Sequence, residues 1–440
     1  MTNFALPLRF IITLFSLTLL PSAFAAVTVE VSTDREDAIY QTGEEVTFTV
    51  TAKDGAKELD WGDIRWVLSR GGYETLSQGD ETLDGGKGLQ VKGKLGRPGF
   101  LLLTATFTGP DGKKTNGYGG AGFAPLEIQP STNAPDEFDE FWDAQKVALA
   151  KIPMEVESVP LTDGVAEAVD AFDVKIKCAN EGPPVSGYFA KSENALPKSL
   201  PAVLFVHGAG VRSSSLGTAV NGAKAGFLSM DINAHGSENG KPQAFYDELK
   251  KGDLNGYTYQ GRDSRDDIYF RAMYVRMIRA IDFLTSQAEW DGQVMAVIGH
   301  SQGGLQALVA GGLDERVTFI GSGVPAGCDH TGMKVDRISG WPKIVPIVDG
   351  KPGPKVIEAS RYIDAVNFAR RCQADAILSV GFIDRTCPPT SVYAAYNALK
   401  GKKEMINEPK MGHARPKPIE EAFWNALKAH VAATKGAVAK

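Results

Sequence analysis

A strand-turn-helix pattern near residue 300 has the residue types of a nucleophilic serine site. The apolar run Val294–Ile298 leads into Gly299–Gly304, which reads GHSQGG, and then into the apolar helical stretch Leu305–Ala310. The glycines on either side of the serine remove Cβ atoms that would clash in so tight a turn. The hydroxyl then stands at a helix N-terminus, where the backbone N–H of Gln302 and the helix dipole stabilise the anion formed on an attacked carbonyl. The pattern predicts that Ser301 is a nucleophile.

A histidine must take the serine proton, because an unassisted hydroxyl is a poor nucleophile. When the serine lies in such an elbow, an acid and then a histidine follow it along the chain. His413 lies in a loop just before the last helical stretch, which is where the base is expected. His330 falls in an insertion and His430 on an amphipathic helix, so we predict a packing or surface role for His430. His413 is the predicted base.

The acid is expected on a turn after the next-to-last strand. Asp384 directly follows the apolar run 377–383, and its carboxylate would fix the tautomer of the imidazole. Asp364 and Asp375 precede that run, so we predict that they lie at the opposite edge of the sheet and are solvated. The predicted triad is therefore Ser301, His413 and Asp384.

The second donor to the oxyanion is expected from the loop after the apolar strand 202–206. That loop begins His207-Gly208-Ala209-Gly210, and we predict that the backbone N–H of Ala209 is the donor and that His207 supports the loop. This chemistry requires no cofactor.

The elements that position these residues follow a change of pattern along the chain. Residues 26–130 alternate apolar and polar types in short runs separated by glycine-containing turns, which predicts an all-β, immunoglobulin-like sandwich. Residues 131–135 resemble a linker, and Asp136 is predicted to cap the helix that follows. Over 136–440 apolar strands alternate with helical stretches, which predicts an α/β-hydrolase domain with a mostly parallel sheet.

The first 25 residues have the features of a secretory signal peptide. Arg9 precedes an apolar run from Phe10 to Leu20, and the small-residue pattern Ala23-Phe24-Ala25 ends the segment. We therefore predict a secreted or periplasmic protein that has no membrane segment after cleavage.

Composition argues against several classes of function. The chain has 53 acidic and 47 basic residues, a net charge of −6, which disfavours nucleic acid as a partner. The four cysteines are scattered, without the close pairs of a zinc site, so no metal is predicted. An oxidising compartment would permit one disulfide, whose pairing the sequence leaves open, as it does the oligomeric state.

At these residues the chain resembles the acetyl xylan esterase and cephalosporin-C deacetylase family of carbohydrate esterases. The most specific likeness is the stretch 381–389, GFIDRTCPP, and further likenesses are FDEFW at 138–142, YFRAMY at 269–274 and the serine elbow. Three positions depart from the family pattern: Ala209 replaces a tyrosine, Asn233-Ala234-His235 replaces Arg-Gly-Gln, and Ala414 replaces the glutamate after the histidine. The resemblance implies a serine esterase that removes acetyl groups from polysaccharides or oligosaccharides, and the predicted signal peptide implies that it is secreted.

Two alternatives remain open. The same triad could hydrolyse other small esters or peptides. The protein could instead act mainly by binding carbohydrate through aromatic side chains of the sandwich, although aromatic residues in a sandwich usually pack in its core. The candidate aromatic residues are Trp61, Trp66, Tyr73 and Tyr118. In the insertion 329–360, a predicted lid, Trp341 could stack on a sugar ring or pack.

Overall fold

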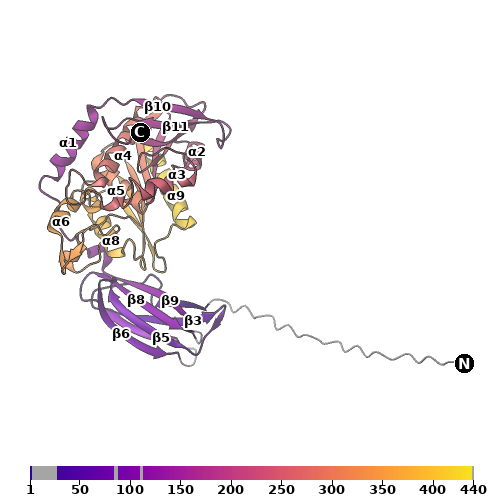
Figure 1. The fold of residues 1–440 in the computed structure, drawn as a ribbon, viewed down its shortest axis with the longest axis vertical. Coiled ribbons are helices and arrows are strands. Elements are labelled where there is room, and N and C mark those ends of the chain that lie inside the picture. Colours follow the sequence, from indigo (N-terminus) through magenta and orange to yellow (C-terminus); the bar gives the residue numbers. More distant parts are fainter. Residues whose placement is uncertain (2–26, 84–87, 110–111, 439–440) are drawn as a thin grey trace.

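The chain forms two separate sheet systems joined by a short connection. The computed structural model describes residues 1, 27–83, 88–109 and 112–438, and apart from Met1 the predicted signal peptide lies outside these residues. Figure 1 shows the N-terminal strands as one body below the larger C-terminal α/β part. Residues 27–123 hold the first nine strands, and the nine-stranded sheet of the C-terminal part begins at Val156.

The N-terminal part is a sandwich of two sheets. One sheet has the order β1-β3-β4 with β7 also paired to β3, and the other has the order β2-β9-β8-β5-β6. Alternate residues of β3, including Val46, Phe48 and Val50, are buried between the sheets, as period-two patterning requires. The strands are β1 (Val27–Thr33), β2 (Ile39–Tyr40), β3 (Glu45–Asp54), β4 (Lys57–Glu58), β5 (Asp63–Arg70), β6 (Glu74–Thr82), β7 (Leu89–Lys94), β8 (Gly99–Thr108) and β9 (Lys114–Phe123).

The C-terminal part is built on a mixed nine-stranded sheet. Its order is β10-β11-β12-β14-β13-β15-β16-β19-β20, and every pair from β14 to β20 is parallel. The first three pairs are antiparallel. The strands are β10 (Val156–Leu161), β11 (Val169–Ile176), β12 (Val185–Ser192), β13 (Leu200–Val206), β14 (Leu228–Asn233), β15 (Trp290–His300), β16 (Phe319–Gly323), β19 (Asp375–Gly381) and β20 (Lys403–Glu408).

Helices cover both faces of this sheet because its central strands are apolar on both sides. In β13, Val203 and Phe205 pack in one cluster with α9, whereas Leu204 and Val206 join the main core with α4 and α5. The helices are α1 (Phe138–Ala150), α2 (Leu216–Lys224), α3 (Gln243–Lys251), α4 (Tyr269–Ser286), α5 (Gln302–Leu313), α6 (Pro354–Arg361), α7 (Ala365–Ala369), α8 (Pro389–Ala398) and α9 (Lys417–Val438), with three single turns, η1 (Pro125–Glu127), η2 (Tyr257–Tyr259) and η3 (Gly332–Val335). The predicted α/β class is confirmed.

The connection differs in one detail from expectation. Helix α1 has Glu137 as its N-cap residue, without a side-chain hydrogen bond, so the predicted cap at Asp136 is wrong.

The predicted lid, 329–360, contains η3, the small hairpin of β17 (Ile347–Val348) and β18 (Lys351–Pro352), and most of α6. Among the described helices, none has the length and hydropathy needed to cross a membrane.

Candidate active site

Ser301 lies at a sharp turn between β15 and α5, near the centre of the sheet. Its backbone has φ 59° and ψ −120°, a strained conformation for a residue with a Cβ, which costs on the order of 1–3 kcal/mol. Hydrogen bonds hold this strain: the Ser301 N–H donates to Gly323 O at 2.8 Å, and its carbonyl accepts from Leu305 N and Ala326 N, each at 3.0 Å. The predicted strand-turn-helix context of the serine is therefore present.

Glycine is required beside the serine because α5 presses against β13. A Cβ on Gly303 would lie 2.1 Å from Val206 O, and one on Gly299 would lie 2.6 Å from the same atom. Both distances are far below van der Waals contact, so neither position has room for a side chain.

The structure brings the three predicted triad residues together. His413 Nε2 lies 2.9 Å from Ser301 Oγ, and His413 Nδ1 lies 2.8 Å from Asp384 Oδ2. Ser301 follows β15, Asp384 follows β19 and His413 follows β20. Because these strands are parallel, their carboxyl ends open on the same edge of the sheet, where α/β proteins place their sites.

Asp384 is placed to accept hydrogen bonds only. Its side chain is fully buried, and Oδ1 accepts the backbone N–H groups of Thr386 at 2.8 Å and Cys387 at 2.9 Å. With Oδ1 occupied by these two backbone donors, Oδ2 is the oxygen left to accept from His413. His413 therefore donates from Nδ1, and its Nε2 lone pair faces the serine hydroxyl.

The loop after β13 lies against the serine. A Cβ on Gly208 would lie 3.3 Å from His300 O and 3.6 Å from Ser301 Cβ, which places the next residue, Ala209, close to the elbow. His207 supports this loop as predicted: Nδ1 donates to Gly208 O at 2.6 Å, and Nε2 accepts from Ala234 N at 3.2 Å. Burial, and then the charge of Arg212, lowers the pKa of His207 to about 4, so it is neutral.

A second buried histidine, which the sequence analysis did not assign to the site, holds the other end of the same loop. His235 lies just beyond β14, and its Nε2 donates to Gly210 O at 3.2 Å, so its Nδ1 accepts from Tyr269 Oη at 2.7 Å. Tyr257 Oη donates to Gln302 Oε1 at 2.6 Å, next to the serine. The available signal was position, since His235 follows a parallel strand at the edge where the triad lies.

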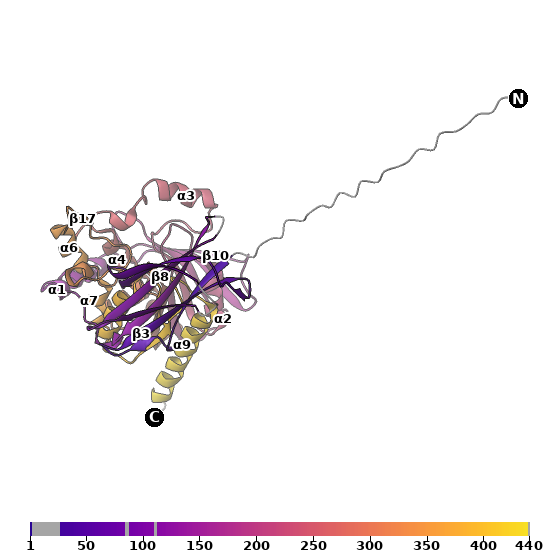
Figure 2. The ribbon, with the colours of Figure 1, turned by 90° about the horizontal axis from the view of Figure 1, so that it is seen from below.

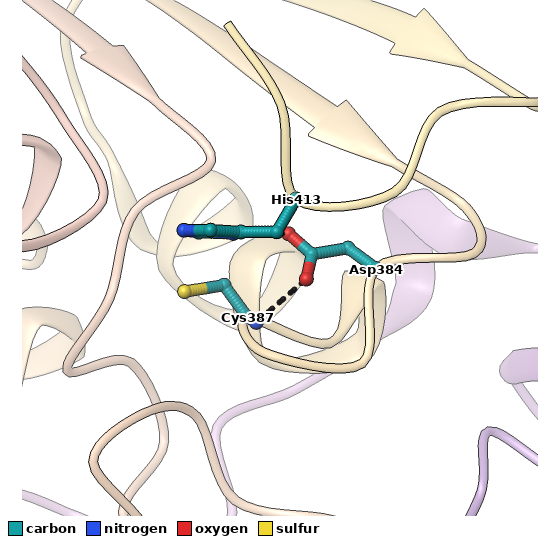
Figure 3. Close-up of side chains that lie close together, drawn as sticks. All are labelled: Asp384, Cys387 and His413. Carbon is teal, nitrogen blue, oxygen red and sulfur yellow. Dashed lines mark hydrogen bonds and ion pairs between the residues drawn. The ribbon is translucent and has the colours of Figure 1, made fainter.

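Cys387 lies beside Asp384 and His413, as Figure 3 shows. Ligand-type atoms of Asp384, Cys387 and His413 all lie within 4.8 Å of one another, a grouping that could hold a metal ion. Burial, and then the Asp384 carboxylate, raises the pKa of the Cys387 thiol well above its ordinary value. Both Asp384 oxygens already accept N–H groups, one from Cys387 N and the other from His413 Nδ1, so the carboxylate is satisfied by hydrogen bonds within this group of residues. These residues suit acyl chemistry better than a metal. All four cysteines are free and buried.

The residues that the sequence analysis weighed against the triad lie elsewhere. Asp364 is buried and accepts the backbone N–H groups of Asp329, His330 and Val366, so the prediction that it is solvated is wrong. His430 bonds Asp375 at 3.0 Å and packs against the sheet.

Trp341 is half-buried and packs on the main core. Its ring centroid lies 6.4 Å from that of Phe270 in an edge-on arrangement. This contact supports the packing alternative, and a role in sugar binding stays a prediction.

Comparison with known proteins identifies the family. The sequence pattern of the acetyl xylan esterase (AXE1) family matches residues 126–428. The chain is 31% identical over 380 residues to the acetyl esterase Axe7A of Xylanibacter ruminicola, an alignment that covers 85% of this chain and 84% of the relative. This alignment is longer than residues 126–428, so it extends beyond the region that the family pattern matches.

Two solved structures have a similar fold. An acetyl xylan esterase from a Paenibacillus species has a TM-score of 0.59 and 26% identity, covering 69% of this chain and 98% of its own. Acetyl xylan esterase 1 from a Thermoanaerobacterium species has a TM-score of 0.58 and 22% identity, covering 69% and 96%. The chain therefore belongs to the acetyl xylan esterase family and is a carboxylic ester hydrolase.

Proposed function

We propose that this protein removes acetyl groups from polysaccharides or oligosaccharides through an acetyl-enzyme intermediate on Ser301. The observation that supports this mechanism is the hydrogen-bond relay from Ser301 Oγ through His413 to Asp384, with both steps below 3 Å. Membership of the acetyl xylan esterase family supports an acetylated carbohydrate as substrate.

The reaction has two halves. In the first, Ser301 Oγ attacks the acetyl carbonyl carbon as its proton moves to His413 Nε2, and the N–H groups of Gln302 and Ala209 stabilise the oxyanion. The tetrahedral intermediate collapses, the sugar oxygen leaves with the proton from His413, and the acetyl group remains on Ser301. In the second, His413 takes a proton from water, the hydroxide attacks the acetyl-enzyme, and acetate leaves as Ser301 recovers its proton.

Asp384 supports His413 in both halves of this reaction. Its buried carboxylate orients the imidazole and stabilises the imidazolium that forms when His413 accepts the serine proton. Because Thr386 and Cys387 fix the carboxylate through their backbone N–H groups, it needs no reorganisation during the reaction.

Acetate release tests the proposal. We expect the wild-type protein to release acetate from acetylated xylo-oligosaccharides and from an aryl acetate, and Ser301→Ala to lose both activities by a factor of about 10⁴ or more. Ser286→Ala, which removes a hydroxyl at the end of α4, is the matched control and retains activity. Full activity in Ser301→Ala would refute the mechanism. Release from the aryl acetate alone would show that acetylated xylan is not the substrate. A preference for longer acyl chains would favour the alternative that the protein hydrolyses other small esters.

We also propose that the protein is exported and that the sandwich is immunoglobulin-like. The features of residues 1–25 support export, and amino-terminal sequencing of the protein made in a bacterial host would test it. The pairing of β3 with β1 and β7 in one sheet, and of β8 with β5 and β9 in the other, supports the immunoglobulin-like order.

A further inference from the structure

One strand of the sandwich touches the segment that holds Asp384. A Cβ on Gly120, in β9, would lie 2.5 Å from Phe382 O, 2.7 Å from Phe382 C and 2.7 Å from Phe382 Cβ. Two of these atoms belong to the backbone, so a flexible side chain could not relieve the contact. Glycine inside a strand often marks such an approach of another backbone.

The neighbouring strand adds an aromatic contact at the same place. Phe100, in β8, is buried, and its ring centroid lies 5.0 Å from that of Phe382 and 5.7 Å from that of Tyr393 on α8. Phe100 and Ala38 belong to the main apolar core of the α/β domain rather than to the core of the sandwich. The two domains therefore share packed apolar surface here.

Phe382 lies in the segment that holds Asp384, and this segment is hydrogen-bonded to the loop that holds His413. Only Ile383 separates Phe382 from Asp384, and the Ile383 N–H donates to Met411 O at 3.3 Å, two residues before His413. On the far side of Asp384, the guanidinium carbon of Arg385 lies 5.6 Å from the ring centroid of Tyr118 in β9. Contacts from the sandwich thus lie on both sides of Asp384 along the chain.

We propose that the sandwich positions the triad: Gly120 and Phe100 fix the backbone of Phe382, and through it the Asp384–His413 hydrogen bond. The inference rests on the catalytic roles proposed above for Ser301, Asp384 and His413. Figure 2, seen from below, shows the sandwich strands directly in front of the α/β part. The sandwich is then a working part of the esterase, whether or not it also binds carbohydrate.

Two alanine substitutions in the same strand test this role in the full-length protein. Gly120→Ala places a Cβ 2.5 Å from Phe382 O, and Gly117→Ala places one at the same 2.5 Å from a backbone oxygen, Val29 O, inside the sandwich. The two variants lie in the same strand, have the same residue change and create clashes of the same distance. Only the first clash falls on the segment next to Asp384.

The expected result is a selective loss of turnover. In Gly120→Ala we expect kcat for aryl acetate to fall about tenfold to a hundredfold with KM within about twofold, because a misplacement of about 1 Å costs on the order of 10² in rate. The acidic limb of kcat against pH should also move to lower pH, since a more distant carboxylate stabilises the protonated imidazole less. Gly117→Ala should lose stability and keep both kcat and the pH profile. Phe100→Leu, which leaves the β9 backbone unchanged, should shift the profile in the same direction.

Each outcome has a clear meaning. Wild-type kcat and pH profile in Gly120→Ala, or equal changes in Gly117→Ala, would overturn the inference while the triad stands. Asp384→Asn, measured beside them, separates the two proposals: full activity in that variant would remove the triad itself, whatever the glycine variants do.

Discussion

Burial decides the charge of most histidines in this chain. His207, His235, His300 and His330 are all in the interior, and desolvation lowers their pKa values, to about 4 for His207 and His330 and about 3 for the other two. Their neutral rings serve as fixed donors, acceptors or packing groups. His413, the predicted base, is instead partly open to solvent beside the serine.

His330 is almost completely buried. Neither of its ring nitrogens has a hydrogen-bond partner. Its pKa of about 4 lies below the value of about 6.5 in an unfolded chain, so the unfolded state binds a proton that the folded state does not as the pH falls through this window. The neutral His330 therefore does not reduce the free energy of unfolding above about pH 6.5, and that free energy falls as the pH drops towards 4.

We predict that His330→Leu makes the protein more resistant to acid. As the pH falls from 7 to 4, the free energy of unfolding of the variant should rise by about 2–3 kcal/mol relative to that of the wild type. In the wild type, His330 binds a proton in the unfolded state but not in the folded state, and leucine binds none. Urea unfolding followed by circular dichroism at several pH values measures this difference. Parallel stability curves for the two proteins would show that His330 does not contribute.

The serine elbow depends on how closely α5 approaches β13. This approach exists only because Gly299 and Gly303 have no side chains, and it places the N-terminus of α5 directly behind Ser301. In the proposed mechanism, the helix dipole and the Gln302 N–H at this terminus stabilise the oxyanion.

We predict that Gly303→Ala moves α5 away from β13. The added Cβ would lie 2.1 Å from Val206 O, so we expect a loss of about 1–3 kcal/mol in the free energy of unfolding and a fall in kcat. Gly217→Ala, in the first turn of α2 with nothing within 4 Å of the added Cβ, is the control and should stay within about 1 kcal/mol of wild type. Thermal unfolding and aryl acetate turnover measure both effects. Equal behaviour of the two variants would contradict the prediction.

The two domains are joined by hydrogen bonds as well as by apolar packing. Asn397, near the end of α8, donates from Nδ2 to Pro125 O and Ile128 O, each at 2.9 Å, in the segment that leads out of the sandwich. Arg337 donates to Gln129 O at 2.7 Å in the same segment. The connection is therefore fixed along its length rather than free.

We predict that Asn397→Ala weakens this junction. Losing both hydrogen bonds removes a donor from each carbonyl, although Pro125 O still accepts the Ile128 N–H at 3.3 Å, and should lower the free energy of unfolding by about 1–3 kcal/mol. Asn116→Ala, an exposed change within the sandwich, is the control and should have little effect. Urea unfolding measured by tryptophan fluorescence compares them. An unchanged midpoint in Asn397→Ala would show that apolar packing alone joins the domains.

Local pattern was sufficient to predict most elements and to select the three residues that the structure brings within hydrogen-bond distance of one another. Ser301 could be recognised because its strand, glycine turn and helix are contiguous, and Asp384 because an apolar strand directly precedes it. The solvation of Asp364 and the cap at Asp136 were predicted wrongly, since both depend on how loops pack.

Contacts between distant segments required the folded chain. Ser301 and His413 are 112 residues apart, and their 2.9 Å separation follows from the strand order β15-β16-β19-β20. The contact between Gly120 and Phe382 depends on how the two domains dock, which local pattern does not specify. Periodicity along a sequence specifies which residues face a core, whereas the neighbours of a residue across a sheet or a domain junction are specified by the summed packing of segments far apart in the chain.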